Sequence, residues 1–140
     1  MNYARNTKDP YRLVGQLCTV GSISSKNGGT YARNRMDILS HYGVQSRLES
    51  PSVEKIARYV GEGRGVIISV DASALWKIND DIIRPHAVVV TSLMRDSKTE
   101  SPLEFYICDS GSKQSCMTVT AVELQGMLLG DMNVTNQVIR

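Results

Sequence analysis

Two polar residues stand at the ends of apolar segments where strands are expected. His86 opens the apolar segment 86–93, and Asp109 follows the apolar segment 103–108. If the two segments pair as an antiparallel hairpin, the start of the first lies beside the end of the second. A carboxylate next to an imidazole fixes the ring tautomer and stabilises the protonated ring, as the orienting member of a catalytic triad does. The spacing therefore fits a general base with its orienting acid.

The same residues also have a purely structural interpretation. A histidine at a strand end is often a satisfied polar group, and Asp109-Ser110-Gly111 is good turn-forming sequence. The other histidine, His41, lies at the end of an expected helix, where the helix dipole favours a cation, and we interpret it as structural. Chain spacing alone leaves both interpretations of His86 and Asp109 open.

The elements that would position these groups are helical first and extended later. Helical spacing of apolar residues predicts a helix from Thr30 to Gly43, and Ser50-Pro51-Ser52 predicts the start of a second. A capping box at Thr120 predicts a short helix that reaches Gly130. Because the helices precede an antiparallel sheet without βαβ alternation, the expected fold class is α+β. Strands are expected at 65–70, 86–93, 103–108 and 134–139.

Three stretches resemble papain-like cysteine peptidases, and among them the bacteriocin-processing branch. These stretches are Gly65–Trp76, His86–Thr91 and Phe105–Gly111. The shared features are a glycine-led strand, a strand that reads His-Ala-Val-Val-Val, and an Asp-Ser-Gly turn, within a resemblance that covers residues 53–129. It implies a papain-like arrangement, with N-terminal helices packed on an antiparallel sheet, His86 as general base and Asp109 as its partner. One departure is Pro85, where the family has glycine.

The resemblance also implies a cysteine nucleophile at a helix start, where the dipole and a protonated histidine activate a thiol. Cys18 is the candidate by position, although the sequence after it predicts a loop. The nucleophile could instead lie on an upstream segment absent from this sequence, or the thiol is lost and the fold has other chemistry or only binds. Cys108 is expected in a strand core and Cys116 in a surface loop, and three cysteines exclude a full disulfide framework.

Similar domains occur at the C-termini of polymorphic bacterial toxins. The resemblance therefore implies an effector domain for competition between bacteria, delivered by a secretion system into the target-cell cytoplasm and matched by a cognate immunity protein. We expect a hydrolase of the peptidase or amidase type that uses Cys18, His86 and Asp109, with Trp76 and Ser110 in substrate binding. One alternative is a metal-independent ribonuclease in which His86 is the general acid and base. A second alternative is a catalytically inactive binding module.

Charge is divided unevenly along the chain. Residues 1–65 contain ten Lys/Arg and five Asp/Glu, a balance of +5, and residues 66–140 contain six and nine, a balance of −3, which together give +2. Such segregation is typical of solvated faces, but a basic face also suits an RNA substrate or an acidic partner. For the ribonuclease alternative, the expected phosphate contacts are Arg33, Arg35, Arg47 and Lys26.

Composition bounds the remaining possibilities. A chain of 140 residues, 41% hydrophobic and 21% charged, suits one domain over residues 1–140, with 1–29 as an irregular N-terminal segment whose completeness stays open. No apolar run reaches the roughly 18 residues of a membrane span, and the first residues lack the apolar core of a signal peptide. Neither zinc-ligand spacing nor a phosphate-binding loop is present, so no metal or cofactor is expected.

Overall fold

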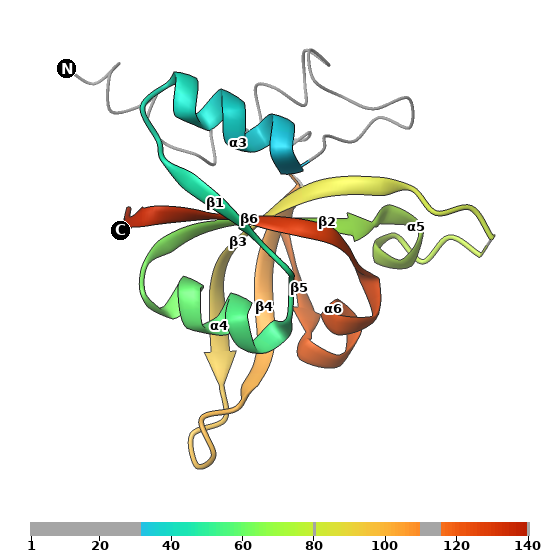
Figure 1. Ribbon diagram of the computed structural model, residues 1–140. Helices are drawn as coiled ribbons and strands as arrows, with labels where there is room; N and C mark the ends of the chain where they lie inside the picture. Colours follow the sequence, from blue (N-terminus) through green and yellow to red (C-terminus); the bar gives the residue numbers. More distant parts are fainter. Residues whose placement is uncertain (1–31, 80, 110–115, 140) are drawn as a thin grey trace.

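The computed structural model describes residues 32–79, 81–109 and 116–139, with Asp109 described by its backbone only (Figure 1). Within these ranges six strands form one sheet in the order β1-β6-β2-β3-β4-β5, and each neighbouring pair is antiparallel. The fold is therefore α+β, as the sequence predicts. In chain order the elements are α3 (Ala32–His41), β1 (Ser46–Glu49), α4 (Val53–Gly61), β2 (Arg64–Asp71), α5 (Ala72–Leu75), β3 (Pro85–Arg95), β4 (Pro102–Asp109), β5 (Cys116–Thr120), α6 (Ala121–Met127) and β6 (Leu128–Val138).

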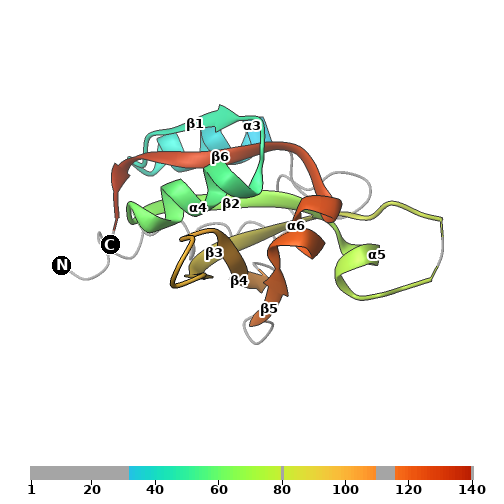
Figure 2. The same ribbon diagram turned by 90° about the horizontal axis from the view of Figure 1, so that it is seen from below.

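Helices cover both faces of this sheet. α4 and α6 lie on one face, over the larger apolar core, and α3 lies on the other, over a smaller core (Figures 1 and 2). Side chains of a strand alternate between the two faces. β2 accordingly sends Val66, Ile68 and Val70 into the larger core and Ile67 into the smaller one. Burial on both faces explains why this strand reads as a continuous apolar run.

Local capping explains where the helices begin and end. The Ser52 hydroxyl accepts a hydrogen bond from the Lys55 amide at 3.2 Å and caps α4, at the end of the predicted start, so that Pro51 lies before the helix instead of in its first turn. Gly43 has a φ of 88° after α3, the left-handed conformation expected of a C-terminal glycine. At α6 the predicted capping box is present. The backbone N–H of Thr120 donates to Glu123 at 2.9 Å, and this hydrogen bond holds the pKa of Glu123 below its ordinary value.

Three features of the sheet differ from the expectation. Strands β1 and β5 are not predicted by the sequence, and β1 lies between the first two described helices, so helices do not simply precede the sheet. The helix expected to reach Gly130 ends at Met127, because Leu128 already pairs with Val70 of β2. β6 therefore begins six residues before Val134, where the strand was expected. At residues 128–130, pairing with β2 therefore overrides the local helical pattern.

Arg35 occupies a buried position in α3. Its side chain is fully buried, and its Nε donates to Asn133 Oδ1 at 2.7 Å while Nη2 donates to Ser69 Oγ at 3.1 Å. Asn133 in turn donates from Nδ2 to the carbonyl oxygen of Ala32 at 2.8 Å. A buried guanidinium is tolerated where hydrogen bonds satisfy it. This network therefore holds α3 on the sheet through β2 and β6.

We expect Asn133→Ala to lower the free energy of unfolding by about 2–3 kcal/mol, because it leaves the buried Arg35 Nε without its acceptor. Urea unfolding followed by circular dichroism measures the change. Asn136→Ala is the matched control, since Asn136 lies on the same strand and makes an exposed contact with Arg47; its effect should stay within about 0.5 kcal/mol. Equal effects of the two substitutions would contradict a structural role for the buried network.

Candidate functional site

The hairpin expected from the sequence is present. β3 pairs with β4 in antiparallel register, with Asp109 opposite Val88. His86 lies two residues from Val88 along β3 and is opposite Val70 of β2. Diagonal positions in an antiparallel pair are about 7–8 Å apart. The fold therefore brings the backbone positions of His86 and Asp109 to the same end of neighbouring strands.

A hydrogen-bonded clamp fixes the chain immediately before His86. Asp71 Oδ1 accepts from the amides of Ser73 at 3.0 Å and Arg84 at 3.1 Å, and the Ala72 amide donates to the Arg84 carbonyl oxygen at 2.7 Å. The Arg84 guanidinium also donates to the buried Ser73 hydroxyl at 2.6 Å. These bonds close the base of the connection between β2 and β3. They set the residue at which β3 begins and hence the position of His86.

The clamp is not predicted by the sequence, because the residues from Asp71 to Pro85 indicate only a polar connection. A local signal was present in Asp71-Ala72-Ser73, since an aspartate often accepts from the amide two residues later. No local sequence pattern indicates that Arg84 is the second partner of Asp71. Arg84 lies eleven residues after Ser73 in the chain, and only the pairing of Asp71 with Pro85 brings it close to Asp71.

The only tryptophan contacts the candidate base. The rings of Trp76 and His86 have centroids 5.4 Å apart with planes inclined at 53°. Trp76 is 49% exposed, whereas His86 is half-buried. The contact also leaves a large part of the indole open to a bound molecule, which is compatible with the predicted role of Trp76 in substrate binding.

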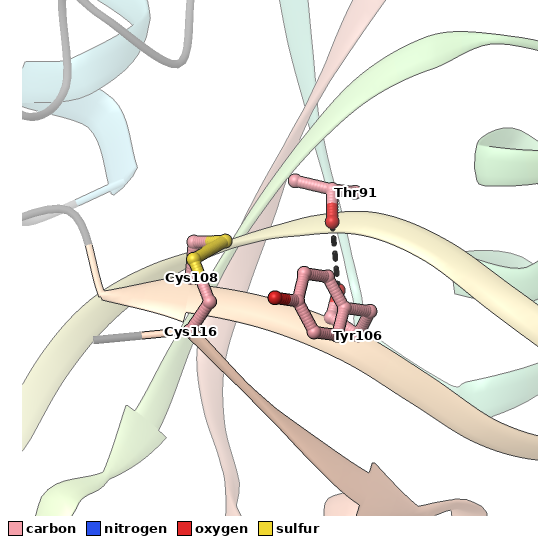
Figure 3. Close-up of a disulfide and its surroundings, with 4 residues drawn as sticks. All are labelled: Thr91, Tyr106, Cys108 and Cys116. Atoms are coloured by element: carbon pink, nitrogen blue, oxygen red, sulfur yellow. Dashed lines mark hydrogen bonds between the residues drawn. A yellow bond between two sulfur atoms is a disulfide. The ribbon is translucent and has the colours of Figure 1, made fainter. Parts of the chain in front are cut away.

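A disulfide joins the strands next to Asp109. Cys108 of β4 and Cys116 of β5 are register partners with Cα atoms 3.9 Å apart, and their sulfur atoms are bonded (Figure 3). Figure 3 also shows Tyr106, whose carbonyl oxygen accepts from the Thr91 hydroxyl at 3.2 Å. The expected loop position of Cys116 is therefore wrong, and Cys108 is half-buried and bonded instead of a free core thiol.

The other predicted residues are scattered. Arg33 is exposed on α3, whereas Arg35 is buried in the network described above, which contradicts a surface contact with phosphate. Arg47 donates to Glu49 at 2.6 Å. His41 is exposed at the end of α3 and contacts Tyr42 edge to face, with centroids 5.2 Å apart. Cys18, Ser110 and Lys26 lie outside the described residues.

No family model matches the sequence, and no match was found among curated proteins. In the described ranges, no group of three or more His, Cys, Asp or Glu side chains could hold a metal ion. The helices of the same ranges include none that is long and apolar enough to cross a membrane. Three observations define the candidate site: the register of β2, β3 and β4, the clamp, and the contact between Trp76 and His86.

We expect the protein, denatured without reductant, to show one reactive thiol per chain, because two of its three cysteines form the disulfide. After reduction it should show three. Reduction should also lower the free energy of unfolding by about 2–3 kcal/mol, the chain-entropy effect of a closed segment of this length. Thiol titration and urea unfolding measure the two effects, with Cys18→Ser as the control that keeps the disulfide. Three thiols without reductant would contradict the pairing.

We expect His86→Gln to change the fluorescence emission of Trp76 at constant pH, because the substitution removes the imidazole ring that contacts the indole. His41→Gln is the matched control and should leave the emission unchanged, because His41 contacts Tyr42 instead. Emission spectra of the folded variants measure both effects. Identical spectra for His86→Gln and the unchanged protein would contradict the Trp76–His86 contact.

Proposed function

We propose that this protein is a hydrolase of the peptidase or amidase type with papain-like site chemistry. The observation that carries the proposal is the register that sets Asp109 opposite Val88, two residues from His86. The register brings these two polar residues to the same end of two strongly apolar strands. Its residue types match a general base and the acid that orients it.

Cys18 is the proposed nucleophile. The fold supports this choice by elimination, because Cys108 and Cys116 lie in strands β4 and β5, where no helix N-terminus activates a thiol. In the proposed reaction His86 takes the proton from the Cys18 thiol as the sulfur bonds to the substrate carbonyl carbon. The protonated His86 then gives that proton to the leaving amine as the carbon–nitrogen bond breaks. Water, deprotonated by His86, hydrolyses the resulting thioester and restores the thiol.

The ribonuclease alternative finds less support. Two of its four expected phosphate contacts are engaged elsewhere, Arg35 inside the molecule and Arg47 with Glu49. Arg33 is the exposed contact among those described, and one cation is little for a polyanionic substrate. A peptide or amide substrate does not require such a cationic surface.

We also propose where the protein acts. The resemblance to C-terminal toxin domains supports an effector that enters the cytoplasm of a competing bacterium and is neutralised by a cognate immunity protein. An acidic partner would suit the +5 balance of residues 1–65. Expression in a bacterial cytoplasm without an immunity protein should therefore inhibit growth.

We expect Cys18→Ser, His86→Ala and Asp109→Asn each to reduce this growth inhibition strongly, because removal of a member of such a site lowers the rate by about 10²–10⁴-fold. Dose-dependent induction measures the loss, with soluble expression matched between variants. His41→Gln is the control for a histidine outside the site and should inhibit growth as the unchanged protein does.

Each contrary outcome has a distinct meaning. Full inhibition by Cys18→Ser would exclude the thiol mechanism, and degraded cellular RNA in that strain would favour the ribonuclease. Full inhibition by His86→Ala would contradict enzymatic action at this site and favour a binding module. Normal growth with the unchanged protein would contradict the effector role.

A further inference from the structure

A cavity of about 340 Å³ opens between α5, β5 and α6. α6 lies between the other two elements and contacts both of them (Figure 2). Apolar side chains line the interior, among them Leu75, Met117, Val119 and Met127. This volume lies within the range of pockets that bind small ligands or single side chains. The lining would favour an aliphatic or thioether group over a polar one.

The cavity shares a face of the sheet with the candidate base. Val119 and Phe105 are register partners, and both belong to the larger core under α4 and α6. Val88 and Val90 belong to the same core, and His86 continues their alternate series along β3. α5 and the residues after it connect the two places, because Leu75 and Lys77 line the cavity while Trp76 between them contacts His86.

The mouth of the cavity is charged but balanced. Lys77 Nζ lies 3.8 Å from Glu123 Oε2, and both side chains are largely exposed. One cation and one anion at the rim provide no net attraction for a phosphate or a carboxylate. Val122 at the same rim is 84% exposed. The charge pattern therefore suits a neutral apolar group with polar atoms on either side, as a peptide has.

β5 offers a place for the backbone of such a peptide. Among the described residues, β5 pairs with β4 along one edge and is the last strand of the sheet. An exposed edge strand can accept an extended peptide as an additional strand, with alternate side chains entering nearby pockets. Met117 and Val119 of this strand both line the cavity.

We propose that this cavity is a specificity subsite, which takes an apolar side chain of an extended peptide that adds along β5. The inference rests on the proposed hydrolase function and deepens it. Because β4 separates β5 from β3, a peptide paired along the outer edge of β5 lies three strand spacings, about 14 Å, from the strand that carries His86. The substrate class is then a polypeptide with a leucine-like or methionine-like residue several positions away from the bond that is cleaved.

Peptide binding tests the proposal without turnover. The probe is acetyl-Gly-Gly-Leu-Gly-Gly-amide, and the reporters are the ¹³C-labelled methyl groups of Met117 and Met127, with exposed Met94 on β3 as the internal control. We expect saturable shifts of the two cavity methyl groups and none at Met94. The same peptide with lysine in place of leucine should give no shift at these concentrations. Silent cavity methyl groups up to about 10 mM leucine probe would overturn the inference.

Gly126→Leu blocks the cavity from α6. A Cβ atom at Gly126 meets no atom within 4 Å, so the new side chain enters open space. We expect it to weaken leucine-probe binding by at least about tenfold, whereas the matched control Gly126→Ala should change binding by less than about twofold. Undiminished binding by folded Gly126→Leu would overturn the proposal.

A backbone-modified probe tests the strand pairing on the unchanged protein, so the result does not depend on a variant that folds. N-methylation of the two amides that flank leucine removes the donors that an added strand needs. We expect binding to weaken by at least about tenfold. Equal binding of both probes would overturn addition along β5.

Failure of the subsite and failure of the proposed function give different results. Growth inhibition that requires His86, together with silent cavity methyl groups, would overturn the subsite alone. Leucine-probe binding together with full inhibition by His86→Ala would overturn the hydrolase function, and with it the assignment of the cavity to a hydrolase.

Discussion

Pairing of β2 with β3 determines the position of every group in the candidate site. Both strands are buried on two faces, so their register is specified twice, once by the core under α4 and α6 and once by the core under α3. A register slip of one residue would turn each side chain of the strand towards the opposite face of the sheet. His86 would then lie on the face covered by α3. Because Val66 and Ile68 face one core and Ile67 faces the other, such a slip would disturb both cores together.

The clamp at the end of this strand pair fixes the two ends of the connection between β2 and β3. Asp71 is the last residue of β2 and accepts hydrogen bonds from the amides of Ser73 and Arg84, so the connection between β2 and β3 leaves and returns at a fixed point. His86, the second residue of β3, then contacts Trp76. On the same face, α5 forms one wall of the cavity. A polar base and an apolar pocket are therefore positioned by the same short connection.

Charged residues illustrate how tertiary context changes the meaning of a sequence pattern. Arg35 stands in a basic segment that suggests a surface for an anion, but its guanidinium is satisfied by Asn133 and Ser69 inside the protein. These partners are 98 and 34 residues away along the chain. No local rule connects them, because the three residues meet only after α3, β2 and β6 have assembled. The positive balance of the N-terminal half is consequently not all available at the surface.

The sequence by itself determined the α+β class, the caps of α4 and α6, the buried strands β2 and β3, and the hairpin that brings His86 towards Asp109. These features depend on residues close together in the chain: alternation, helical spacing, and a serine or threonine before a helix. The tertiary structure alone decided the edge strands β1 and β5, the early start of β6, the burial of Arg35, the pairing of Cys108 with Cys116, and the clamp at Arg84. Each of these features depends on a partner from another element. The contact therefore stabilises the fold only after the two elements have packed together. The cavity beside α5 belongs with the second group, since three separate elements form its walls.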